Sequence, residues 1–137
     1  MKITHQQRLQ QLRHALLNLH KALVDSERAH YEKTVGAVQS SNHFLQLLIR
    51  DPSFAWLHPL SQLIVAMDEA LDEKEPLTVA GVDALVKQTR LLLLASESGA
   101  GFSKHYFDAL QRDPDVVLAH AHVAKLFGSR NKMRSIP

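Results

Sequence analysis

The sequence predicts an all-α protein: a helical bundle of five to six helices with one long N-terminal helix. Leucines near the N-terminus recur at alternating three- and four-residue spacing, which is typical of an amphipathic helix in a bundle. The tripeptide Arg-Asp-Pro occurs twice, at residues 50–52 and 112–114, between helix-patterned runs. Because Asp is a preferred N-cap and Pro is tolerated in the first turn, each copy indicates one helix ending and another beginning. No run alternates with period two for long enough to predict a strand.

The first expected helix spans residues 6–38. Its apolar seam consists of five leucines, at Leu9, Leu12, Leu16, Leu19 and Leu23. A short helix over 42–50 follows, capped by Ser40 or Ser41. Asp51-Pro52 then opens residues 53–57, and Pro59 is expected to kink the next helix or restart it, because proline lacks the N–H donor.

Three further helices are expected in the second half of the chain. Thr78 is the expected N-cap of a helix over 79–95, and a loop of small residues separates this helix from one over 102–112. The last helix is expected over 114–127, with Gly128 in the terminating position. We therefore predict a single domain over residues 1–128 and a basic, disordered tail over 129–137.

Bulk composition excludes several classes of protein. The chain has 137 residues, 45% of them hydrophobic and 22% charged, which is ordinary for a globular domain. It has no cysteine, so disulfides and thiolate metal sites are excluded and a cytoplasmic location is expected. The N-terminal residues lack the apolar segment of a signal peptide, and no apolar run approaches the length of a membrane span. A net charge of +2 is too small to predict nucleic-acid binding, and the tail's Arg130, Lys132 and Arg134 lack interleaved aromatic residues.

The leucine seam of the first helix becomes polar in its second half. Continued past Leu23, the same face carries Glu27 and His30. A Glu-x-x-His pair on an inward helix face is what ferritin-like di-iron bundles use, but such sites need a second copy, and the sequence has none.

A mononuclear metal site remains an alternative. His105 shares a face with Tyr106, and His120 lies in an apolar stripe of the last helix. If these helices pack on the first one, Glu27, His30, His105 and His120 converge on a site suited to zinc, iron or nickel. The competing interpretations are a satisfied polar network at the edge of the core and a small-molecule pocket between helices.

Trp56 precedes the break at Pro59, and His58 lies beside it. These two residues are candidates for lining a ligand or partner groove. The more common role of such a tryptophan is a core anchor whose indole N–H finds a partner.

Residues 54–65 (FAWLHPLSQLIV) resemble a segment of a family of small uncharacterised bacterial proteins, and the similarity extends weakly into 19–32 and 113–122. The resemblance implies a bacterial cytosolic helical protein and transfers no catalytic residue.

No nucleophile elbow or other enzyme signature occurs in the sequence. We therefore expect a non-catalytic bundle that acts through protein–protein interaction, with a homodimer and an unidentified protein partner as the expected assemblies. No cofactor is expected, and the alternative is the metal-binding bundle described above.

Overall fold

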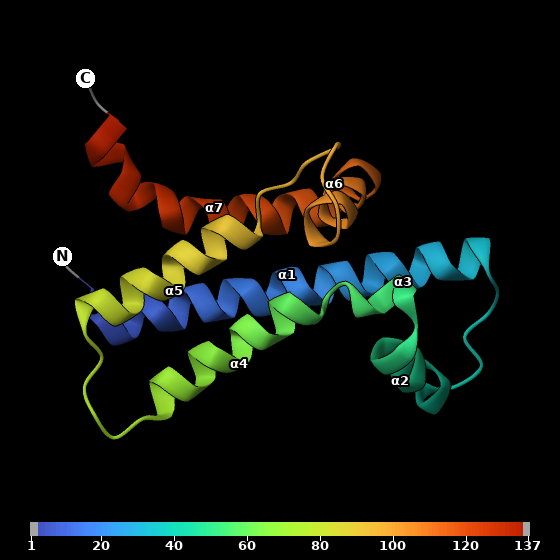
Figure 1. Ribbon diagram of the computed structural model, residues 1–137, viewed down its shortest axis with the longest axis horizontal. Coiled ribbons are helices and arrows are strands. Elements are labelled where there is room, and N and C mark those ends of the chain that lie inside the picture. Colours follow the sequence, from blue (N-terminus) through green and yellow to red (C-terminus); the bar gives the residue numbers. More distant parts are fainter. Residues whose placement is uncertain (1–2, 136–137) are drawn as a thin grey trace.

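The computed structural model describes the backbone of residues 3–135 and the side chains of residues 3–127, and within this part the chain is all-helical with no strand. Between residues 3 and 135 seven helices follow one another: α1 (His5–Thr34), α2 (Ser41–Arg50), α3 (Pro52–Ala55), α4 (His58–Asp72), α5 (Val79–Leu92), α6 (Phe102–Arg112) and α7 (Pro114–Ser135). The all-α prediction is confirmed (Figure 1).

The predicted count of five to six helices was wrong because the two prolines near residue 55 separate three helices. Asp51 caps α3, where its side chain accepts a hydrogen bond from the Ser53 amide at 2.8 Å. This helix ends after one turn, and α4 restarts with Pro59 in its first turn. A proline in the first turn sacrifices no intrahelical hydrogen bond, so the chain gains a new helix rather than a kink.

Several predicted helix ends also differ from the structure, including α5, which ends at Leu92 rather than at residue 95. α1 ends at Thr34 rather than at residue 38, so the long N-terminal helix is present but shorter than expected. The backbone of α7 passes Gly128 without stopping and continues to Ser135. The side chains from 128 onward, including the basic groups of the predicted disordered tail, lie outside the described residues.

Other helix starts follow the predicted capping chemistry. Thr78 caps α5 and Ser40 caps α2 through their hydroxyl oxygens. A capping box that was not predicted starts α1, where Thr4 and Gln7 form reciprocal bonds of 2.9 and 3.0 Å. α6 instead starts at Phe102 after the N-cap Gly101, whose φ of 62° lies in the left-handed region that favours glycine.

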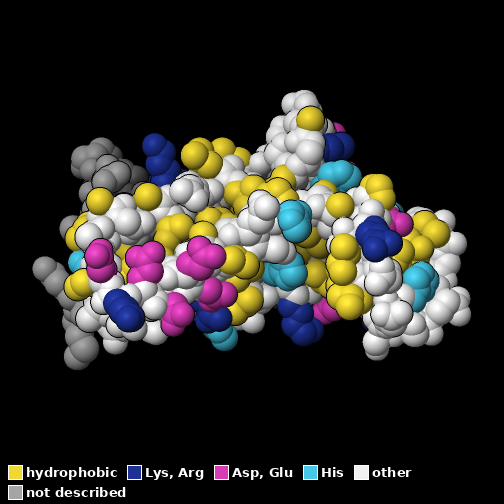
Figure 2. All heavy atoms as spheres, turned by 60° about the horizontal axis from the view of Figure 1, so that its bottom comes forward, with side chains coloured by type: hydrophobic (Ala, Val, Ile, Leu, Met, Phe, Trp, Pro, Cys, Tyr) yellow, Lys and Arg dark blue, Asp and Glu magenta, His cyan; other side chains and the backbone are white. Residues whose placement is uncertain are grey.

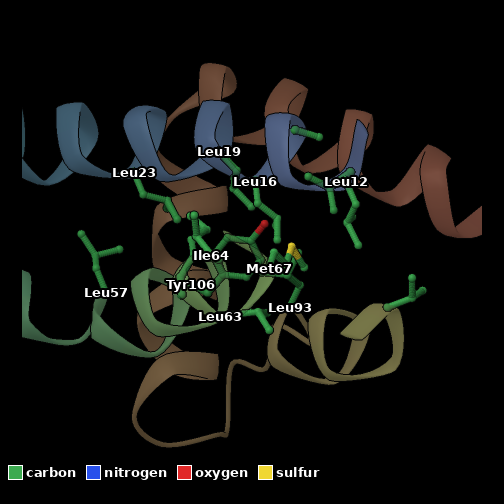
Figure 3. Packing of buried hydrophobic residues seen from close by; sticks show 14 of the residues in the cluster. Leu12, Leu16, Leu19, Leu23, Leu57, Leu63, Ile64, Met67, Leu93 and Tyr106 are labelled. Atoms are coloured by element: carbon green, nitrogen blue, oxygen red, sulfur yellow. The ribbon is translucent and has the colours of Figure 1, made fainter. Parts of the chain in front are cut away.

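α1 is the central element, and α4 and α7 pack along opposite sides of it, with α5 beside all three (Figure 1). Its five seam leucines are almost completely buried. Figure 3 shows four of them pointing toward Ile64 and Met67 of α4 and toward Tyr106 of α6. The predicted seam is therefore the centre of the hydrophobic core. Burial of each such side chain stabilises the fold by roughly 1.5–3 kcal/mol.

Within the described part of the chain, none of the helices combines the length and apolar character that crossing a membrane requires.

Candidate functional site

Glu27 lies near the end of the buried face of α1 and is held by an arginine from α6. Arg112 donates from Nη2 to Glu27 Oε1 at 2.8 Å and to Ser26 Oγ at 3.2 Å. The Glu27 side chain is 8% exposed and that of Arg112 is 30% exposed. A carboxylate this deeply buried requires such a partner, because removal from water penalises the charged form. The pair thus ties the second half of α1 to the junction between α6 and α7.

His30 does not share the environment of Glu27. Its side chain is exposed, although the two residues are one helical turn apart. α1 extends past α4 and α7 (Figure 1), and His30 belongs to the last two turns of the helix. The predicted Glu-x-x-His pair is therefore divided between a buried ion pair and the surface.

Trp56 is a core anchor at the joint between α3 and α4. It is 9% exposed, and its ring lies 5.2 Å from the ring of Phe102 and 5.3 Å from that of His105. The His105 ring is stacked on the indole with an interplanar angle of 18°, and its outer side is exposed to solvent. Trp56 Nε1 is buried and has no hydrogen-bond partner within the described residues, which differs from the usual pairing of buried indoles. His58 is exposed at the first position of α4.

His120 forms a hydrogen-bonded pair with the fully buried Tyr106. The Tyr106 hydroxyl lies 2.6 Å from His120 Nδ1. Burial raises the pKa of the Tyr106 hydroxyl far above its usual range and lowers the pKa of the half-buried His120. Both groups are therefore neutral at pH 7, and the hydrogen bond between them pairs two neutral side chains. The pair links α6 to α7 across the tight turn at Asp113.

The four predicted metal ligands are engaged separately. Glu27 binds Arg112, His105 stacks on Trp56, His120 pairs with Tyr106, and His30 faces solvent. Across the described residues, no three His, Asp or Glu side chains lie in a group that could hold a metal ion. The metal hypothesis stays a prediction from sequence, and the geometry favours the polar-network interpretation of these residues.

Sequence reasoning missed Arg112 as the partner of Glu27 and Tyr106 as the partner of His120. The Arg-Asp-Pro repeat did place Arg112 at a helix end, where cations are favoured. Nothing in the spacing indicated which helix would lie opposite, because that depends on tertiary packing.

Part of the apolar surface of α2 is not covered by the rest of the bundle. The helix packs its inner side, which carries Phe44 and Leu47, against α3 and the end of α1. Leu45 and Ile49 lie one turn apart on the outer side and are 51% and 62% exposed. At about 100° per residue, the apolar arc from Leu47 through Phe44 and Leu45 to Ile49 spans about 200°, of which the bundle covers only part.

Figure 2 shows hydrophobic side chains at the surface of the end that carries α2, whereas acidic side chains gather at the opposite end over the last turns of α4. The outward side of α2 is also free of charge: its exposed polar residues near Leu45 and Ile49 are Ser41, Asn42 and Gln46. An uncharged apolar strip on a short helix is the geometry of a contact surface, not of a reaction centre.

A comparison with models of known protein families, with characterised proteins and with solved structures found no match. The similarity of residues 54–65 to small bacterial proteins therefore stays a resemblance and assigns no role to any residue.

Proposed function

We propose that the protein is a non-catalytic interaction module that associates with a second copy of itself through the outer face of α2. The observation that carries the proposal is the uncovered apolar strip of Leu45 and Ile49. When the apolar face of a helix is wider than the part buried by its own domain, a partner normally covers the remainder.

The chemistry of the strip favours a second copy as the partner. In a two-fold dimer the same patch meets itself, so any charge in it would face a like charge. The strip contains only leucine, isoleucine and uncharged polar side chains, so two copies meet without repulsion. Arg50 and His43 lie on the other side of the helix, outside the strip.

The small size of the strip determines the affinity that we expect for the dimer. α2 has 10 residues, and a helix of that length spans about 15 Å. An interface built on one such helix falls at the low end of the size range of specific complexes, where association is weak and reversible. We expect a dimer that dissociates on dilution, and we propose that it works in the cytoplasm and that a further protein partner uses the same strip.

Sedimentation velocity over a wide concentration range tests the proposal. The wild type should shift from monomer to dimer as the concentration rises, and the variant Leu45→Gln/Ile49→Lys should remain monomeric. The matched control is Leu118→Lys on α7, since Leu118 is 69% exposed and lies away from α2. A wild type that is monomeric at every concentration, or a control that dissociates equally, contradicts the proposal.

Metal analysis of the same tag-free protein tests the alternative. Stoichiometric zinc, iron or nickel that is lost in His30→Ala would establish the metal-binding bundle in place of the interaction module.

A further inference from the structure

A small cavity lies where the first turns of α1, the middle of α5 and the distal part of α7 meet, away from α2 and close to the N-terminus (Figure 1). Its walls are mainly apolar: Ile3 before α1, Leu12 from α1, Val86 from α5, and Leu126 and Phe127 from α7. Arg8 and Gln11 supply the polar part of the lining. An apolar cavity with few polar groups is the usual form of a small-molecule site.

The volume of the cavity limits the ligand to about one ring. It measures about 140 Å³. An engineered apolar cavity of about 150 Å³ is known to stay dry and to bind benzene. A six-membered ring with one small substituent therefore fits in it.

The charge of the lining limits the ligand further. Arg8 donates from Nη1 to Asp83 Oδ1 at 2.8 Å, so its positive charge is already balanced. A carboxylate ligand would have to compete with Asp83 for the guanidinium. A neutral oxygen needs no such competition, because the guanidinium has five N–H donors and the ion pair uses only part of them.

The aromatic side chain in the lining, Phe127, is in contact with a second arginine. The Arg90 guanidinium lies over the Phe127 ring at 5.4 Å from its centroid. A cation–π contact of this kind fixes the orientation of the ring. The aromatic wall and the paired Arg8 are thus preorganised for a ligand that combines an apolar ring with one acceptor.

We infer that this cavity binds a small neutral ring compound bearing a single hydroxyl or carbonyl oxygen, of the phenol class. The ring packs between Leu12, Val86 and Phe127, and the oxygen accepts a hydrogen bond from Arg8. The inference is independent of self-association through α2, so either one can fail without the other.

Titration of isotope-labelled full-length protein with phenol, toluene and benzoate, followed by amide chemical shifts, tests the inference. Phenol should shift amides around the cavity at lower concentration than toluene, and benzoate should bind most weakly. In Val86→Phe the added ring fills the cavity and should weaken phenol binding by roughly tenfold or more. Val65→Phe on the exposed face of α4 is the matched control and should bind as the wild type does.

Arg8→Met provides a second variant that leaves the cavity volume nearly unchanged. It should reduce the affinity for phenol to that for toluene and leave toluene binding unaltered. The inference is overturned if none of the three probes causes localised shifts, if benzoate binds as tightly as phenol, or if Val86→Phe and Val65→Phe bind phenol equally.

Discussion

Replacement of Arg112 by methionine leaves the buried carboxylate of Glu27 without its cationic partner and should destabilise the protein. The methionine keeps much of the apolar length of the side chain but removes both hydrogen bonds, to Glu27 and to Ser26. Loss of one partner from a fully buried ion pair costs about 3–5 kcal/mol, whereas exposed pairs contribute about 0–1 kcal/mol. Because Glu27 is 8% exposed but Arg112 is 30% exposed, we expect an intermediate loss of about 2–3 kcal/mol.

Urea denaturation followed by circular dichroism gives the free energy of unfolding for this comparison. The second Arg-Asp-Pro copy offers a matched control, since Arg50 also precedes Asp-Pro at a helix end but is exposed and forms no ion pair with a described residue. Arg50→Met should change the stability by less than about 0.5 kcal/mol. The loss in Arg112→Met corresponds to a fall in melting temperature of roughly 8–12 °C for a domain of this size.

The double variant Glu27→Gln/Arg112→Met distinguishes two causes of destabilisation, an unpaired buried charge and the loss of packing. Without its charge, the side chain at position 27 no longer needs a cation, so the double variant should be more stable than Arg112→Met alone. If Arg112→Met loses no more stability than Arg50→Met, the ion pair contributes nothing net to the fold. If the double variant is no better than the single one, the loss comes from packing and the electrostatic reasoning is refuted.

Three further predictions concern the core and its histidines. Tyr106→Phe keeps the ring but removes the bond to His120, and should lower the free energy of unfolding by about 1 kcal/mol in urea titrations. Burial lowers the pKa of His20 and of His120 in the folded state, so the unfolded chain binds more protons below its ordinary pKa of about 6.5. Stability should therefore fall as the pH drops below about 6.5, by at most about 1.4 kcal/mol per pH unit for each group. His20→Asn/His120→Gln should flatten this slope in urea titrations at pH 7.5 and 5.5, and an unchanged slope contradicts the assignment. Leu19→Ala should lose about 2–5 kcal/mol in the same assay, whereas Leu17→Ala, whose side chain is partly exposed, should lose far less.

The parts of the fold that the sequence predicts well are those determined within one helical turn. Thr78 caps α5, and Asp51 and Asp113 accept hydrogen bonds from amides two residues further on, because these contacts involve only neighbouring residues. The leucine spacing of α1 predicts its buried face for the same reason. Prediction fails where a weak local preference is overridden by tertiary packing. Gly128 does not stop α7, since a glycine inside a helix costs only about 1 kcal/mol and the surrounding turns outweigh it.

In the candidate sites too, the sequence predicts local features of the side chains but not their tertiary contacts. Spacing identified Glu27 and His120 as unusual because each lies on an otherwise apolar face, and both are indeed engaged in buried or half-buried polar contacts. Their partners come from other helices, 85 residues away for Glu27 and 14 for His120, and helix periodicity carries no information about such pairings. The sequence of α2 contains several apolar residues, and only the packing of the helix shows which of them the bundle leaves uncovered. A polar residue on an apolar face therefore indicates a buried partner where other helices cover that face, as at Glu27 and His120, but not where the face is open, as at His30. A surplus of apolar residues indicates a surface that a partner covers. The identity of the partner, within the chain or beyond it, follows from three-dimensional packing, so the sedimentation experiment on α2 addresses what the sequence of this protein leaves undetermined.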